Sequence, residues 1–264
     1  PEADQVNAVT ENNDLPRLRF PRPNVVDIAP EYKRLRARAP LAKVRTPAGD
    51  TAWLATGYHV AKRLFADDRL GRSHPDPRNA ARVSNSIRFG GPQGDYATEK
   101  DLHTLHRRLL APAFSARRMR LLADHIDELA EKMIVRMAGL TPPVDLHEHL
   151  SFPLPLQVIC ELLGVPVDAR DQIRAWSWRY AGLTDEAEAM TAGREMAEYI
   201  ASLVEAKRTA PGDDLLSDLI AASGEHDLLS TAEIVDMGVN LLFGGHETTV
   251  ARLDYGTLLL LASA

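Results

Sequence analysis

The longest uninterrupted hydrophobic pattern in the chain covers residues 231–262 and predicts one long helix. Ser230 followed by Glu233 has the spacing of a capping box, which marks a helix start, and no proline interrupts the stretch. At 1.5 Å per residue, about thirty residues span roughly 45 Å, enough to cross a whole domain. Because apolar side chains lie on most sides of this helix, we expect it to be buried on most sides.

Shorter patterns predict that the rest of the chain is mainly helical, with one small β-sheet near the N-terminus. Apolar residues recur at helical spacing in eight further stretches: residues 30–39, 58–66, 102–110, 116–137, 156–163, 168–183, 185–207 and 213–222. Residues 42–45 and 51–55 flank a turn and predict a β-hairpin, and residues 144–146 suggest a short strand. Residues 68–101 are rich in Gly, Pro, Asn and Arg, and a loop of this length is normally functional or mobile.

The composition narrows the class of protein. A net charge of −6 argues against general nucleic-acid binding, and no run of apolar residues is long enough for a membrane span. Residues 1–14 are polar and acidic, which predicts a loose lead-in rather than a signal peptide. Cys160 is the only cysteine, which excludes an internal disulfide and suits the cytoplasm. We therefore expect a cytoplasmic protein that binds neither nucleic acid nor membranes, and we expect it to be a monomer.

The local rules for a helix break in the middle of the long one, at residues 244–249 (Gly-Gly-His-Glu-Thr-Thr). Two adjacent glycines cost about 1 kcal/mol each relative to alanine, and buried polar side chains need partners. The glycines let a large group approach the backbone, and Thr248 can hydrogen-bond the carbonyl of Gly244. Glu247 and Thr248 would then form an acid–alcohol pair that relays protons into a dry pocket. The alternative is a solvated carboxylate beside a helix kink.

The His246-Glu247 pair also invites a comparison with zinc hydrolases. Their helical motif needs a second histidine four residues after the first. That position is Val250 in this chain, so the pattern argues against a zinc site. We expect His246 to point toward a surface or a polar edge.

A second candidate site lies in the predicted helix over residues 102–110. His103 and Arg107 are four residues apart and therefore share one face, where they could clamp an anion such as a carboxylate. The alternative is a solvated basic face, which the spacing alone favours.

Two further features have simple structural explanations. Cys160 lies on an apolar helix and is expected to be a small core residue rather than a nucleophile or a ligand. Trp176, Trp178 and Tyr180 cannot all share one helix face, so at least one of them should point outward or into a ligand space.

Four stretches follow one another in a recognisable order: residues 29–71, His103 to Arg107 with Ala-Phe-Ser at 113–115, residues 159–166, and residues 244–249. As an ordered set they resemble the opening region, the C helix, the end of the E helix and the I helix of a cytochrome P450 of the soluble bacterial kind. The resemblance implies a mainly α cytochrome P450 fold with a small N-terminal β-sheet and a long central I helix. It implies a single P450 domain over residues 1–264, incomplete at its C-terminus, with residues 68–101 as the B–C loop.

The resemblance also implies the cofactor, which would be haem b (iron protoporphyrin IX), and O2 as co-substrate. His103 and Arg107 would bind a haem propionate. Gly244 and Gly245 would lie close to the haem plane and leave room for oxygen, and Thr248 would also contact the cofactor side.

Other roles follow from the same resemblance. Glu247 and Thr248 would be catalytic, because they would deliver the protons that promote O–O cleavage. Residues 84–97, 176–183 and 237–244 would line the substrate pocket, and the side chains expected there are Ile87, Phe89, Trp178 and Leu241. Arg108 and the arginines among residues 117–120 would help to dock an acidic ferredoxin.

The implied function is that of a haem-thiolate monooxygenase. It would insert one oxygen atom of O2 into an apolar small molecule, such as a bacterial secondary metabolite, with electrons from a ferredoxin and its reductase. The family's Glu-x-x-Arg motif and its iron-ligating cysteine are expected beyond Ala264, so no residue of this chain is expected to bind the metal. The alternative is a non-catalytic helical binding module that keeps the scaffold without the haem-ligand loop.

Overall fold

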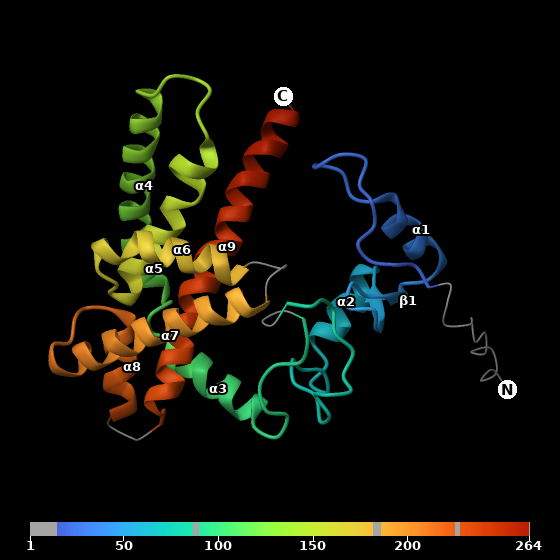
Figure 1. Cartoon of the computed structure of the whole chain (residues 1–264), viewed down its shortest axis with the longest axis horizontal. Coiled ribbons are helices and arrows are strands. Elements are labelled where there is room, and N and C mark those ends of the chain that lie inside the picture. The colour runs from blue at the N-terminus through green and yellow to red at the C-terminus, as the bar shows by residue number, and fades with distance from the viewer. Residues whose placement is uncertain (1–14, 87–89, 182–185, 225–227, 264) are drawn as a thin grey trace. The chain divides into compact units, whose positions relative to one another are not determined.

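The computed structural model (Figure 1) describes the following residues: 15–86, 90–181, 186–224 and 228–263. The chain forms two compact units, Pro1–Asp101 and Leu102–Ala264. The described residues are mainly helical, with a two-stranded sheet in the first unit, as the sequence predicts. Within these ranges no helix combines the length and the apolar character needed to span a bilayer.

The first unit is organised around the predicted hairpin. Its regular elements are helix α1 (Pro30–Arg38), strands β1 (Leu41–Arg45) and β2 (Thr51–Ala55), and helix α2 (Tyr58–Phe65). The strands pair antiparallel, with Leu41 opposite Ala55. The turn between them contains Gly49, whose φ of 91° lies in the left-handed region that favours glycine. The hairpin predicted from the sequence is therefore confirmed.

A long loop follows α2, as predicted. Residues 66–86 and 90–98 contain neither helix nor strand. The carboxylate of Glu99 accepts hydrogen bonds from the side chain of Ser73 and from the backbone N–H groups of Arg72 (2.7 Å) and Ser73 (3.1 Å). These bonds, the Ser73 hydroxyl first, hold the pKa of Glu99 below its usual value. They tie the start of the loop to the residue where it ends.

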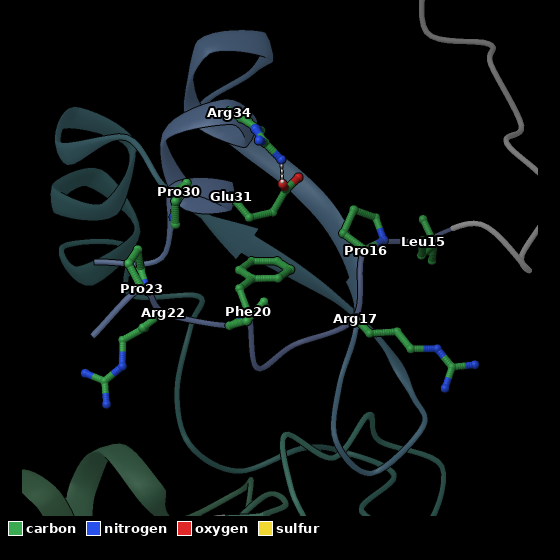
Figure 2. Close-up of a pocket in the computed structure, with 10 residues that line it drawn as sticks. Leu15, Pro16, Arg17, Phe20, Arg22, Pro23, Pro30, Glu31 and Arg34 are labelled. Atoms are coloured by element: carbon green, nitrogen blue, oxygen red, sulfur yellow. Dashed lines mark hydrogen bonds and ion pairs between the residues drawn. The ribbon is translucent and has the colours of Figure 1, made fainter. Parts of the chain in front are cut away.

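The first unit also contains a pocket of about 670 Å³, drawn in Figure 2. Phe20 lies at its floor, and four prolines contribute to its lining. Arg34 points toward Glu31 and pairs with it at 3.2 Å, whereas Arg17 and Arg22 point away from the pocket (Figure 2). Its described lining contains no buried polar atom without a partner, so we assign no ligand to it.

The second unit consists of helices packed around one core. Its elements are α3 (Glu99–Leu110, which begins at the boundary), α4 (Ala116–Ala138), the π-helix η1 (His147–Ser151), α5 (Pro153–Leu163), the 3-10 turn η2 (Val167–Ala169), α6 (Arg170–Ala181), α7 (Glu186–Thr209), α8 (Leu215–Gly224) and α9 (Thr231–Ala262). Local chemistry sets several ends. Ser115 caps α4, Pro153 opens α5, and Gly164, with a φ of 66°, ends α5.

Helix α9 is the predicted long helix, and most of the second unit is built on it. Its capping box is confirmed, because Glu233 and Ser230 each bond the other's backbone N–H group. It packs against α5, α7, α8 and η1, and its inward side chains belong to the buried core of the unit. The expected burial on most sides is confirmed only in part as far as Val250, because Gly244, Gly245, Thr248 and Thr249 are exposed. It is wrong for the last turns, where Leu258 to Leu261 are 38–75% exposed.

The strand suggested at residues 144–146 is wrong. The side chain of Asp145 accepts hydrogen bonds from the backbone N–H groups of His147 (2.8 Å) and Glu148 (3.2 Å). A carboxylate that satisfies two successive N–H groups favours a helical turn over a strand. The segment therefore leads into η1.

A buried ion pair supports the end of α5. Lys207 Nζ lies 2.6 Å from Asp214 Oδ2, and the two side chains are only 11% and 6% exposed. Asp214 also accepts hydrogen bonds from the backbone and the hydroxyl of Ser217. A Cβ atom at Gly164 would collide with Asp214 and Lys207. The ion pair can therefore lie this close to the end of α5 only because residue 164 is glycine.

We predict that Lys207→Met lowers the free energy of unfolding by about 3–5 kcal/mol, because it leaves the Asp214 charge buried without its partner. Urea denaturation measures the change. Lys132→Met is the matched control, since Lys132 pairs with Glu128 in an exposed position, and we expect a loss of at most about 1 kcal/mol. Equal losses for the two variants would contradict this account.

Candidate functional site

The two glycines in the middle of α9 have different surroundings. A Cβ atom at Gly245 would lie 2.7 Å from Cδ1 of Ile159, a side chain of α5. A Cβ atom at Gly244 would meet nothing within 4 Å. Gly245 therefore allows α9 to pack closely on α5, whereas Gly244 leaves an open face in its own direction, about 100° around the helix axis from Gly245.

Thr248 lies on the same face as Gly244, one turn further along the helix. Its hydroxyl donates a hydrogen bond of 3.0 Å to the carbonyl of Gly244, as the sequence predicts. Thr249 makes only a long contact of 3.5 Å with the carbonyl of Gly245. The helix stays continuous through this region, so the bond forms without the break that paired glycines permit. Thr248 is exposed, and the side chain of Glu247 is 34% exposed.

The expectation for His246 is wrong, because this side chain is fully buried. Its Nδ1 atom lies 2.7 Å from the carbonyl oxygen of Leu242, and its ring packs edge-on against Phe152 and Phe243 at 5.7 and 6.0 Å. Burial lowers the pKa of His246, with only partial compensation from the Leu242 carbonyl and the Glu247 charge. The prediction relied on the polarity of the side chain. In the structure, the hydrogen bond to Leu242 and the contacts with two aromatic rings favour burial instead.

Helix α3 also separates a packed face from a free one. Leu105, Leu109 and Leu110 pack against the core of the second unit. His103 and Arg107 are exposed and have no ion-pair partner in the described part of the chain. The predicted shared face is confirmed by the helix over Glu99–Leu110. Two basic groups that no protein anion neutralises could bind an external anion.

The side chains expected to line a substrate pocket give a mixed picture. Ile87 and Phe89 lie outside the described residues. Leu241 is partly buried against the core, and Trp178 is 74% exposed. The outward position of Trp178 confirms the argument from the three crowded aromatics, since Trp176 is buried and donates its Nε1–H to Glu195 at 2.8 Å. Whether Trp178 and Leu241 contact a substrate stays a prediction.

Other candidates are sorted by their partners. Cys160 is fully buried, and burial raises the pKa of its thiol to about 12, so it is a core residue as expected. Arg118 bonds Asp218 at 2.6 Å and Asp213 at 3.2 Å, which makes it a structural link rather than a free docking charge. In the described part of the chain, no group of three or more His, Cys, Asp or Glu side chains could hold a metal ion.

Sequence reasoning missed two residues that shape the site. Ile159 occupies the space beside Gly245, and the ring of Phe152 packs against His246. Phe152 immediately precedes α5 and Ile159 lies in its middle, and nothing in their spacing points to residues about ninety positions later. Only the packing of α5 on α9 brings them together.

Comparisons with known proteins show which proteins this chain is similar to. No protein-family model matches the chain. Pentalenolactone synthase from Streptomyces exfoliatus is 41% identical over 251 residues, which are 94% of this chain and 62% of that protein. Cytochrome P450 monooxygenase PikC from Streptomyces venezuelae is 37% identical over 238 residues, 89% of this chain and 56% of PikC. The chain thus spans about three fifths of the length of these relatives.

A solved structure is similar throughout the same region. The substrate-free cytochrome P450 PimD, described as a polyene macrolide antibiotic pimaricin epoxidase, superposes with a TM-score of 0.80 at 36% sequence identity. The match covers 91% of this chain and 62% of PimD. The fold predicted from the sequence is therefore confirmed.

The two glycines provide a matched pair of tests. Gly245→Ala should lower the free energy of unfolding by about 1–3 kcal/mol, because the new methyl group overlaps Ile159. Gly244→Ala should raise it by up to about 1 kcal/mol, because alanine is the better helix former and its methyl group meets nothing. Urea denaturation of the ligand-free protein measures both. A greater loss at Gly244 than at Gly245 would show that the open face is assigned to the wrong residue.

Proposed function

The chain belongs to the cytochrome P450 family, of which it matches an N-terminal portion, and on that premise we propose that the native protein is a haem-dependent monooxygenase. It would insert one oxygen atom of O2 into an apolar small molecule. The observation that carries the proposal is the open face at Gly244 with the Thr248 hydroxyl beside it. We also propose that residues 1–264 belong to one P450 domain, with residues 68–101 as its B–C loop and α9 as its I helix.

The described residues suit a haem in two ways. Gly244 offers an open stretch of helix backbone against which a flat ring can lie. His103 and Arg107 are exposed donors on one face of α3, where they would hold a propionate through charge-assisted hydrogen bonds. Haem with a thiolate ligand supplies the chemistry that activates O2. Cys160 does not suit that thiolate, because burial keeps its thiol protonated, so we propose that the iron ligand comes from outside these 264 residues.

Glu247 and Thr248 would together deliver protons to the open face. The hydroxyl of Thr248 donates a hydrogen bond to the Gly244 carbonyl, which fixes its oxygen on the open face. The lone pairs of that oxygen remain available to accept a hydrogen bond from a proton donor. Glu247 is one third exposed and can reach solvent, so it can take up a proton and pass it toward this face. Thr248 would hold in place the group that accepts the proton, and Glu247 would supply further protons from solvent.

The substrate and the electron donor follow by analogy with relatives. Proteins named for pentalenolactone and for pimaricin epoxidation are among them, which supports an apolar secondary metabolite as the substrate. Trp178 and Leu241, with Ile87 and Phe89, would contribute to the substrate pocket. We propose a ferredoxin with its reductase as the donor, docked by exposed arginines such as Arg108, Arg117 and Arg120. A cytoplasmic monomer fits this role.

A carbon monoxide difference spectrum of the reduced native protein tests the proposed function. The proposal expects the red-shifted Soret band of a thiolate-ligated haem. A protein that takes up no haem during expression with haem precursor would instead support a non-catalytic helical module, which nothing in the described structure favours at present.

We predict that replacing both His103 and Arg107 with leucine weakens haem affinity by roughly 10²- to 10⁴-fold, because two hydrogen bonds to a charged group contribute about 1.5–3 kcal/mol each. Transfer of haem to an excess of apomyoglobin measures the affinity. Arg108→Leu, which removes the neighbouring exposed charge, should leave haem transfer unchanged. If the double variant retained haem as tightly as the parent protein, the proposed binding of a propionate by His103 and Arg107 would be wrong.

We predict that Thr248→Ala reduces the product formed per NADH consumed by about tenfold or more, since positioned proton donors contribute about 10²–10⁴-fold. Parallel measurement of product, NADH and hydrogen peroxide in the reconstituted native enzyme gives this ratio. Thr249→Ala is the control, because its hydroxyl makes only a 3.5 Å contact with a different carbonyl. Unchanged coupling in Thr248→Ala would contradict the proton-relay role.

A further inference from the structure

His246 contains a buried polar atom that the packing leaves without a partner. The Leu242 carbonyl can only accept a hydrogen bond, so Nδ1 of His246 must carry the ring proton. Nε2 then presents a lone pair, and it has no hydrogen-bond partner among the described residues. A buried acceptor left unpaired costs about 1–3 kcal/mol. A phenylalanine would fill the same aromatic site without that cost, so the nitrogen calls for an explanation.

A carboxylate lies close to this nitrogen. Oε1 of Glu247 lies 3.9 Å from Nε2 of His246. An ionised carboxylate and an imidazole lone pair both accept hydrogen bonds, so these two atoms cannot bond each other directly. Once Glu247 carries a proton, its O–H group becomes a donor, and a closure of about 1 Å gives an ordinary hydrogen bond.

Groups on the adjacent elements do not compete for this nitrogen. Arg174 of α6 lies over the Phe152 ring at 5.1 Å, and His147 of η1 stacks on that ring at 5.7 Å while bonding Asp254 at 2.8 Å. Both groups contact the Phe152 ring, and neither is a hydrogen-bond partner of His246 Nε2, which has none among the described residues. Glu247, on the same helix as His246, remains the proton donor within reach.

We propose that His246 is a positioning residue for Glu247: its Nε2 lone pair accepts a hydrogen bond from the carboxyl of Glu247 whenever that carboxyl carries a proton. The inference deepens the proposed monooxygenase function and rests on it. His246 lies opposite Gly244 on the helix, so the bond holds the loaded acid away from the open face until the carboxyl turns toward Thr248. The proton balance closes, because Glu247 gives one proton to the open face, becomes a carboxylate, and takes one proton back from solvent.

The first test needs no turnover. Histidine labelled with 15N in the native protein, held in a diamagnetic state, reports the bonding of Nε2 through its chemical shift. Glu247→Gln places a neutral N–H donor where the protonated acid would be, and Glu247→Ala places none. We expect the Nε2 resonance of His246 to show the upfield shift of a hydrogen-bonded acceptor in Glu247→Gln and not in Glu247→Ala. Identical shifts in the two variants would overturn the proposal.

The second test uses the coupling of the native enzyme. His246→Phe fills the aromatic site but lacks the acceptor, and we expect product per NADH to fall about two- to tenfold, the range that one hydrogen bond represents. His246→Gln keeps an acceptor at the position of Nε2 and should restore most of the coupling, which a purely structural role would not predict. If both variants retain parent coupling, or both lose it equally, the positioning role is wrong.

The two proposals fail separately. A native protein with the thiolate-type carbon monoxide band, but with equal Nε2 shifts in Glu247→Gln and Glu247→Ala, keeps the monooxygenase function and loses the role of His246. Absence of that band overturns the monooxygenase function, and with it the purpose of the His246–Glu247 contact. The 15N measurement uses variants of Glu247 and leaves His246 in place. Its result therefore does not depend on whether His246→Phe or His246→Gln folds.

Discussion

The contact between the backbone of α9 at Gly245 and the side chain of Ile159 on α5 sets the orientation of the central helix. On the adjoining side of α9, His246 is enclosed by Phe152 and Phe243. Together these contacts leave the helix no freedom to rotate about its axis, because a well-packed interface tolerates little change in shape. At about 100° per residue, Gly244 then lies on the side of α9 away from His246, and Thr248 lies one turn further along that side. The position of the candidate site is thus a consequence of how Gly245 and His246 pack.

A similar division explains α3. Leu105 and Leu109 pack against the core, whereas His103 and Arg107 are exposed and have no ion-pair partner among the described residues. Exposed basic residues are common and mean little alone. Their significance comes from the combination with an open glycine face on α9 within the same unit. A ligand that has both a flat ring and acidic groups would suit both features, and this is the basis on which we propose haem as the cofactor.

The sequence predicted the elements and their chemistry better than their surroundings. The capping box of α9, the hairpin, the Thr248–Gly244 hydrogen bond and the inert Cys160 all depend on short-range patterns, and all are confirmed. His246 was misplaced because its polarity suggested an edge, whereas the aromatic groups that bury it come from residue 152 and from one turn earlier in its own helix. The different roles of the two glycines depend on Ile159, and no local pattern could reveal that contact.

The central claim is that a haem lies against the Gly244 face of α9 and is held through its propionates by α3. A crystal structure of the haem-loaded native protein tests this claim most directly. The account predicts that the porphyrin plane contacts the backbone at Gly244, and that at least one propionate bonds both His103 and Arg107. A structure in which protein side chains fill the Gly244 face, or in which the propionates bind elsewhere while these two residues face solvent, would contradict it.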